Sequence, residues 1–285
     1  MSIQFPRTSV GGVSMPRMII GSNWLLGYSH STASRGGLIL ERNGNVEAVS
    51  EIAQAYLTYG IDAIMIPYNP DERCATLLRG LSDAEQKTGK EIKKIIVVNP
   101  DVTDSKEKRK SAEELIKKSK EAGATFTFIF HDAVEQLLDK HTGTIPRLSD
   151  YLSMVRSHGM IPGLSAHMPE VVIYSDQNNY DVESYIQIYN CMGFLMQLEV
   201  EYIHKVIHNA KKPVMTIKSM AAGRVTPFVG LSFSYATIRE QDMVVCGAFT
   251  PDEVHEDAEI ALAAIERRCP DVEGRPSPSK TAAMK

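Results

Sequence analysis

The residue with the clearest chemical potential is His131, which follows an apolar run. The run Thr125–Phe130 alternates threonine or isoleucine with three phenylalanines and ends abruptly at His131 and Asp132. A histidine titrates near neutral pH, so it can act as a general acid or base or stabilise an oxyanion. In parallel α/β proteins the carboxyl ends of strands carry the chemistry. We therefore predict that His131 is catalytic, with a hydrogen-bonded structural histidine as the alternative.

Asp132 has two candidate roles. It could orient the imidazole of His131, or it could cap a helix that starts at this point. Aspartate is among the preferred N-cap residues, so we favour capping.

A second group of polar residues follows the first apolar run. Asn23 and the only tryptophan, Trp24, precede a hydroxyl-rich segment from Gly27 to Gly37 that contains His30 and Arg35. Trp24 could form a wall of the substrate site or pack as a lid or core residue. We predict a long loop that roofs the site. Its composition suits a phosphate or a polyol, and equally suits a solvated flap.

Histidines from different segments raise the question of a metal. His30, His131 and His167 could converge with Asp101 or Asp132, but no short motif joins them. A metal site needs three or four groups within bonding distance, so we expect no metal and rank a divalent ion below a nicotinamide cofactor.

Two basic residues lie near the end of a later apolar run. Lys218 ends the run Val214–Ile217 and could form a Schiff base if burial lowered its pKa. Arg224 could bind an anionic group or pair with an acid at the rim.

The elements that position these residues alternate between strand-like and helical patterns. Helical spacing occupies the intervening segments, with Ser105 and Thr250 as predicted N-caps. Eight strands alternating with helices predict a single (β/α)8 TIM barrel over residues 1–270, and no G-x-G-x-x-G supports the alternative, a doubly wound open sheet. Residues 271–285 are predicted to be a disordered tail. The eight strand-like runs begin at Met18, Asp62, Ile95, Thr125, Met160, Ser184, Val214 and Met243.

Composition limits the classes of function. The chain has 285 residues, 43% of them hydrophobic and 23% charged, and a net charge of −4. It lacks a basic excess for nucleic acid and an apolar run long enough for a membrane span. The four cysteines form no C-x-x-C pair and no signal peptide is evident, so we expect a cytoplasmic protein whose partner is a small molecule; the oligomeric state stays open.

Several segments together resemble an aldo-keto reductase. These are Gly163–Val172 (GLSAHMPEVV), Gln187–Asn190 (QIYN), Val214–Arg224 (VMTIKSMAAGR) and Val245–Asp257, with looser matches at Arg17–Ser22, Gly60–Ile64 and the His131 strand. The resemblance covers about residues 10 to 268 and implies a (β/α)8 barrel, which agrees with the strand count. It also implies hydride transfer between NADP or NAD and a carbonyl compound.

The resemblance assigns roles to individual residues. His131 matches the family's catalytic histidine, and Tyr68 lies near its catalytic tyrosine. Asn99 stands in place of the family's lysine, and the family's aspartate is absent near Tyr68. Without those two groups a phenol, with a reference pKa of about 10, is a poor acid at neutral pH.

The cofactor site implied by the resemblance also departs from the pattern. Gln187 is kept, while the nicotinamide-binding Ser-Asn pair is Ser165–Ala166. Lys218 is assigned a structural or phosphate-binding role, with Arg224 nearby, and Thr250 lies where the nucleotide phosphate would sit. Standard NADPH-dependent reduction is therefore expected to be weakened or lost.

Three functions remain open from the sequence. The first is an enzyme of aldo-keto reductase-like descent that acts on a carbonyl or polyol, sugar-like substrate through His131. In it Tyr68, Asn99, His167 and Gln187 line the site. The second is an NAD(P)H-dependent oxidoreductase that uses His131 and Tyr68. The third is a non-catalytic barrel that binds a metabolite or partner.

Overall fold

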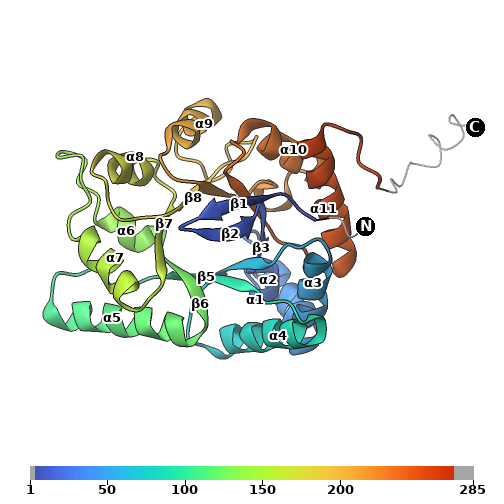
Figure 1. The fold of residues 1–285 in the computed structure, drawn as a ribbon, viewed down its shortest axis with the longest axis horizontal. Coiled ribbons are helices and arrows are strands. Elements are labelled where there is room, and N and C mark those ends of the chain that lie inside the picture. Colours follow the sequence, from blue (N-terminus) through green and yellow to red (C-terminus); the bar gives the residue numbers. More distant parts are fainter. Residues whose placement is uncertain (1–3, 273–285) are drawn as a thin grey trace, which may run out of the picture.

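Eight parallel strands close into a barrel in the computed structural model, which describes residues 4–272. The ring order is β10-β3-β4-β5-β6-β7-β8-β9, so each strand pairs with its sequence neighbours and the last pairs with the first (Figure 1). This confirms the predicted (β/α)8 barrel and excludes the open sheet. The strands are β3 (Met18–Gly21), β4 (Ala63–Pro67), β5 (Lys93–Val98), β6 (Ala124–Ile129), β7 (Ile161–Ala166), β8 (Tyr185–Ile188), β9 (Val214–Ile217) and β10 (Met243–Cys246).

Helices surround the barrel (Figure 1). The predicted caps are confirmed: the Ser105 hydroxyl accepts from the Lys108 amide at 3.1 Å, and the Thr250 hydroxyl accepts from the Glu253 amide at 3.1 Å. The helices are α1 (Asn23–Leu26), α2 (Ala33–Asn43), α3 (Val46–Thr58), α4 (Glu72–Thr88), α5 (Lys106–Glu121), α6 (His131–Gln136), α7 (Leu148–Ser157), α8 (Glu170–Gln177), α9 (Val200–Asn209), α10 (Pro227–Thr237) and α11 (Pro251–Glu266), with a short 3₁₀ turn η1 (Ala221–Gly223).

Two apolar cores follow from alternation along the strands. On β5, Ile95 and Val97 face the barrel interior, whereas Ile96 and Val98 face the helices. This is the two-residue period of a strand, and burial on both sides explains why the strands are continuously apolar. Because side chains fill the interior, the barrel has no pore and only its ends are free for binding.

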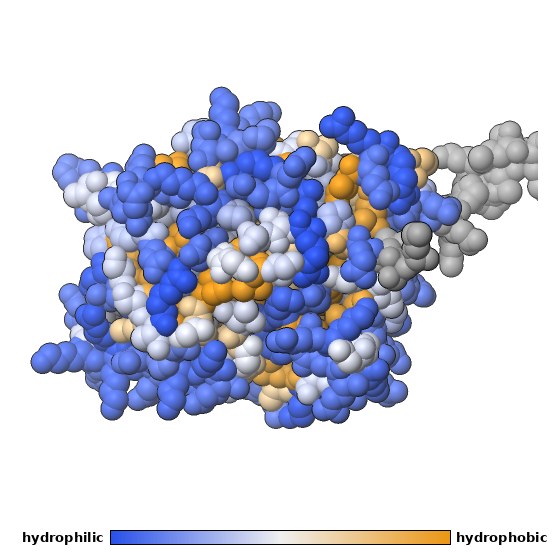
Figure 2. All heavy atoms as spheres, in the orientation of Figure 1, coloured by the Kyte–Doolittle hydropathy of each residue, from blue (hydrophilic) through white to orange (hydrophobic). Residues whose placement is uncertain are grey.

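A β-hairpin that the sequence analysis missed covers the N-terminal end of the barrel. Its strands, β1 (Arg7–Val10) and β2 (Val13–Pro16), lie in front of the barrel in Figure 1. Val10 and Met15 are fully buried in the inner core, so the hairpin plugs this end. The face shown in Figure 2 is largely hydrophilic, with apolar side chains visible mainly between elements. The opposite, C-terminal end is left for a site.

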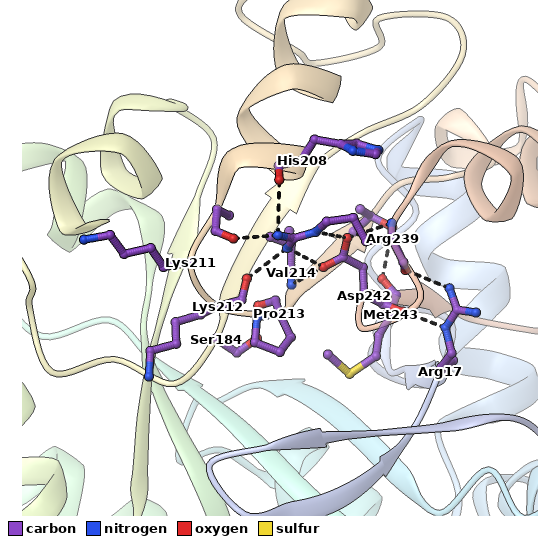
Figure 3. A network of polar contacts seen from close by, with 12 residues as sticks. Arg17, Ser184, His208, Lys211, Lys212, Pro213, Val214, Arg239, Asp242 and Met243 are labelled. Atoms are coloured by element: carbon purple, nitrogen blue, oxygen red, sulfur yellow. Dashed lines mark hydrogen bonds and ion pairs between the residues drawn. The ribbon is translucent and has the colours of Figure 1, made fainter. Parts of the chain in front are cut away.

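A buried polar network ties three strands together at the N-terminal end (Figure 3). Arg239 pairs with the fully buried Asp242 at 2.7 Å, and Asp242 also accepts from the Val214 amide at 2.8 Å. Arg17 donates to the main-chain oxygens of Asp242 and Arg239 at 3.1 and 2.9 Å. The network joins the starts of β3, β9 and β10, so these charges are compensated where they are removed from water.

The predicted long loop from Gly27 to Gly37 is wrong in its second half. The helix α2 begins at Ala33, and Thr32 caps it by accepting from the Arg35 amide at 3.2 Å. Gly36 and Gly37 are weak helix formers and obscured this start in the sequence. Gly36 is nevertheless needed, because an added Cβ would lie 2.8 Å from the Gly27 carbonyl oxygen.

Two predictions concern the whole chain, of which the structure describes residues 4–272. The predicted tail lies outside the described residues from 273 onward, and residues 271 and 272 belong to no helix or strand. No helix within residues 4–272 is long and apolar enough to cross a membrane.

Candidate functional site

Two histidines stack at the C-terminal end of the barrel. The rings of His131 and His167 have centroids 3.5 Å apart and an interplanar angle of 23°. The Phe130 ring also lies close to His131, with ring centroids 4.0 Å apart. His131 begins α6 directly after β6, and His167 follows β7, so two neighbouring strands deliver the pair.

Lys218 and His30 join this pair from two further strand ends. The Lys218 Nζ lies 3.0 Å from Nε2 of His30, in the segment between α1 and α2. Lys218 directly follows β9 and has φ of 63°, a left-handed conformation that is strained for a residue with a Cβ. Such strain occurs at functional sites, where the surrounding structure enforces it. We call His30, His131, His167 and Lys218 the basic cluster.

Burial lowers the pKa of every member of the basic cluster, so the three histidines are largely neutral at pH 7 while Lys218 stays mostly protonated. Desolvation is the main cause in each case, since it disfavours the charged form. The pKa of His167 falls to about 3, through burial and then the nearby His131, Lys218 and His30. The pKa of Lys218 falls to about 8 through burial. Burial and Lys218 also lower the pKa of His30 and of His131, while Asp132 opposes the shift at His131.

The acids beside the cluster have defined roles. Asp132 is the second residue of α6, and its carboxylate lies 3.0 Å from Nε2 of His131. It caps nothing, so the favoured capping role was wrong and the imidazole-orienting alternative fits. Glu135, missed from the sequence, accepts from the amides of His167 and Met168 at 2.6 and 2.7 Å. It lies four residues after His131 on α6.

An aromatic and guanidinium stack lies after β3. The rings of Trp24 and Phe249 are 5.5 Å apart, and the Arg35 guanidinium lies 5.3 Å from the Trp24 ring. Asn43 donates to the main-chain oxygens of Trp24 and Phe249, both at 3.0 Å. These contacts pack α1, α2 and the segment after β10 against one another. Asn23 begins α1, and its carbonyl accepts from the Tyr28 amide at 3.0 Å.

The structure does not bring Tyr68 to the basic cluster. Along β4, Ala63 and Met65 face the barrel interior and Ile64 and Ile66 face the helices. Tyr68 continues the second set and packs in the helix layer, where burial raises the pKa of its phenol. A phenol so placed is a weaker acid than a free tyrosine, so the catalytic role taken from the resemblance has no support in the geometry.

Asn99 and Asp101 follow β5. Asn99 is exposed and continues the inward-facing positions of Ile95 and Val97, so it lies at the mouth. Asp101 pairs with Lys108 at 2.7 Å and accepts from the Thr103 amide at 2.9 Å. These bonds lower the pKa of the Asp101 carboxyl and use it to order the approach to α5. Asp101 is therefore not one of the groups that meet the histidines.

The residues that the resemblance assigns to a cofactor site have different surroundings in the structure. Gln187 is buried and donates at 3.4 Å to the His167 carbonyl oxygen, while its own Oε1 has no partner within the described residues. Ser165 is buried near the end of β7. The Arg224 guanidinium lies 4.1 Å from the Phe194 ring and pairs with no acid in residues 4–272.

Thr250 does not present a free site for a phosphate. Its hydroxyl caps α11, and the Glu253 carboxylate accepts from the Phe249 amide at 2.7 Å. A carboxylate thus occupies the helix start where an anion would be stabilised by the helix dipole. With Tyr68 in the helix layer as well, the residues present do not fit NADP-dependent hydride transfer, and only the orphaned Gln187 oxygen favours a bound amide.

A metal is not supported at the mouth either. Within residues 4–272 no three histidine, cysteine, aspartate or glutamate side chains are arranged to hold a metal ion. Nε2 of His30, which would have to serve as a ligand, already contacts the Lys218 amine.

The two best-formed hollows in the described residues lie away from the basic cluster. Two shallow hollows of about 340 and 290 Å³ lie near the starts of the strands, and the first is lined by Gly123, Ala124 and Gly159 among others. Both lie at the hairpin end, where parallel barrels do not carry their chemistry. The site is therefore assigned from its side chains and their position at the strand ends.

Comparison with known proteins identifies the fold and nothing finer. No protein family model matches the chain, and no curated protein matches its sequence. A solved structure of PA4992, described as "the putative aldo-keto reductase from Pseudomona aeruginosa", aligns with a TM-score of 0.62 at 13% identity. It covers 91% of this chain and 96% of that one; a second structure of a protein so described gives 0.64 at 12%.

A different class of enzyme shares the barrel. Ribulose-1,5-bisphosphate carboxylase/oxygenase from Pyrococcus horikoshii aligns with a TM-score of 0.52 at 14% identity, over 79% of this chain and 56% of that one. At such identities the likeness concerns the fold alone.

Proposed function

We propose that this protein is an enzyme that acts on a small carbonyl compound of the polyol or sugar-like type by proton transfer at the C-terminal mouth of the barrel. The stacked pair of His131 and His167 beside Lys218 carries the proposal. Hydride transfer from a nicotinamide has no part in the mechanism.

The state of the two histidines suits removal of a proton next to a carbonyl group. Because burial lowers the pKa of both imidazoles, both are neutral at pH 7, and His131, where Asp132 opposes the shift, is the stronger proton acceptor of the two. Asp132 stabilises the charge that His131 gains on protonation, through its 3.0 Å contact. The amine of Lys218, once protonated, would stabilise the negative charge that develops on the carbonyl oxygen.

Proton exchange gives a direct test. The protein is incubated in D₂O with a panel of aldehydes, ketones and sugars, and loss of the proton next to the carbonyl is followed by NMR. His131→Gln and His167→Gln should reduce exchange by about 100-fold or more, in the range expected for a general base. His141→Gln, at an exposed histidine away from the cluster, is the matched control. Equal exchange in all variants would contradict the proposal.

The second candidate is an NAD(P)H-dependent oxidoreductase, favoured by the whole-chain fold likeness to the described aldo-keto reductases. Titration with NADPH and NADH, followed by nucleotide fluorescence, separates the two. Micromolar binding would support the oxidoreductase, and no binding at millimolar nucleotide would remove it. A metabolite-binding barrel without activity would show neither proton exchange nor loss of ligand affinity on His131→Ala.

A further inference from the structure

We propose that Lys218 is a nucleophile that forms a Schiff base with an anionic oxo compound, meaning an aldehyde or ketone that carries a carboxylate or phosphate. The inference rests on the proposed function, since it names the substrate class and the covalent step at the same site.

The position of the amine is the first argument. Lys218 is half-buried at the end of β9, with its Nζ held 3.0 Å from His30. Its left-handed backbone breaks the strand alternation, in which Met215 and Ile217 face inward, so Lys218 reaches the mouth from a position that would otherwise face the helices. An ion-paired structural lysine needs no such distortion.

The charges around the amine indicate an anionic ligand. Within residues 4–272 no carboxylate lies within 4 Å of the Lys218 amine, whereas Lys93 and Lys94 at the other end of the barrel each have one. Around Lys218 stand His30, His131 and His167, and all three become cations when protonated. Asp132 faces His131 and is over half exposed, and Glu135 is held by two amides. An anionic substrate would supply the negative charge next to the Lys218 amine.

The amine is also in the form that reacts. A pKa of about 8 leaves roughly a tenth of Lys218 unprotonated at pH 7, about two orders of magnitude more than for a free lysine. Burial beside other cationic groups is a recognised way to activate a lysine towards carbonyl compounds.

The covalent step is balanced without any further reactant. The Nζ lone pair attacks the carbonyl carbon, the π bond of the carbonyl group breaks, and the oxygen takes up a proton from the solvent to give an N-protonated carbinolamine. His30, whose Nε2 lies 3.0 Å from Nζ in the resting structure, carries one of the two amine protons to the hydroxyl. The C–O bond then breaks, water leaves, and the nitrogen lone pair forms the C=N bond. The protonated imine acidifies the neighbouring C–H, which His131 or His167 can deprotonate.

Reductive trapping tests the proposal with defined probes. The full chain is incubated at pH 7.5 with sodium cyanoborohydride and pyruvate or glyceraldehyde 3-phosphate, with the uncharged hydroxyacetone and glyceraldehyde as matched probes. Adducts are located by peptide mass spectrometry. We expect one adduct at Lys218, formed at least 10-fold faster with the anionic probes. The peptide of Lys110, an exposed lysine on α5, is the internal reference for ordinary reactivity.

The variants make the result decisive. Lys218→Arg should remove the adduct while melting like the wild type, and Lys110→Arg should leave it unchanged. Labelling of Lys218 no faster than Lys110, or no adduct with any of the four probes, would overturn the Schiff base. Proton exchange in D₂O that persists without an adduct would overturn this inference and leave the proposed function standing. Loss of exchange in the His131 and His167 variants with the adduct intact would confirm both.

Discussion

At the N-terminal end of the barrel, partly buried lysine and arginine side chains are paired with carboxylates, whereas at the C-terminal end the Lys218 amine has no carboxylate within 4 Å in residues 4–272. Asp62 pairs with both Arg7 and Lys93. Asp242 pairs with Arg239, and Arg17 donates to the main-chain oxygen of Asp242 (Figure 3). At the other end four basic residues meet, and the nearest acids are an exposed Asp132 and an amide-bound Glu135. Because the same eight strands form both ends, the barrel fold by itself does not require this difference in charge pairing.

The contrast separates stability from function. Paired buried charges hold strand starts in register, and removal of one partner is costly. Unpaired basic groups destabilise the folded state, because each gives up hydration without a counter-charge. Under the proposed function, the neutral imidazoles of this cluster accept a proton and the Lys218 amine faces an anionic substrate. Mutations of charged residues at the two ends should therefore change the stability of the protein differently.

The largest expected effect is at the paired end. Asp242→Asn should lower the free energy of unfolding by about 3–5 kcal/mol, because it leaves Arg239 partly buried without its counter-charge. Urea denaturation measures the loss. Asp132→Asn, at the unpaired end, should change stability by less than about 0.5 kcal/mol, since that pair is exposed. Equal losses in the two variants would remove the contrast between the ends.

The next effect has the opposite sign. Lys218→Met should stabilise the protein at pH 7 by up to about 3 kcal/mol, because it removes a desolvated cation. The folded pKa of about 8 lies below the unfolded value, so the unfolded state binds more protons between these values. Wild-type stability therefore rises with pH above 8, and the gain from the substitution should vanish above pH 10.5.

The same measurement on a paired lysine provides the control. Lys93→Met removes a lysine that contacts Asp62 at 2.8 Å, so it should destabilise by about 1 kcal/mol at pH 7. A loss of stability in Lys218→Met as large as that in Lys93→Met would show that Lys218 is an ordinary structural residue.

A loss smaller than that of Asp242→Asn is expected at Glu135, the carboxylate that holds the segment after β7. Glu135→Ala leaves two amides without their acceptor and should lower stability by about 2 kcal/mol. Glu135→Gln keeps an acceptor oxygen and should lose less. Thermal melts give the stabilities, and ¹H–¹⁵N spectra should show the amide shifts of His167 and Met168 moving most in both variants.

The smallest effect is electrostatic and concerns His167. Its NMR titration should be flat from pH 8 down to pH 5, because its pKa is about 3. Lys218→Met should raise that pKa, by less than about one unit, through removal of a nearby positive charge. A midpoint near 6.5 in the wild type would mean that the ring is solvated and that the cluster is not assembled in solution.

The barrel could be predicted from the sequence because its signals are local. Apolar runs of strand length alternate with helical patterns, and Ser105 and Thr250 mark helix starts by side-chain chemistry within four residues. The hairpin escaped prediction because only Val10, Met15 and Pro16 of its two strands are buried, too few to give a pattern. The start of α2 escaped because its glycines oppose the helix that tertiary packing imposes.

The site was predictable only in outline. Strand ends in the sequence placed His131, His167 and Lys218 at one end of the barrel, because parallel strands align their carboxyl ends. In the structure, the alternation of side chains along β4 places Tyr68 in the helix layer, which disagrees with the catalytic role that the resemblance implied. The sequence by itself determined which chemistry could stand at each strand end. Only the tertiary structure decided which of these groups meet. The closure of the barrel brings His131 onto His167, and the left-handed backbone of Lys218 brings its amine to His30. Their burial follows from the same closure.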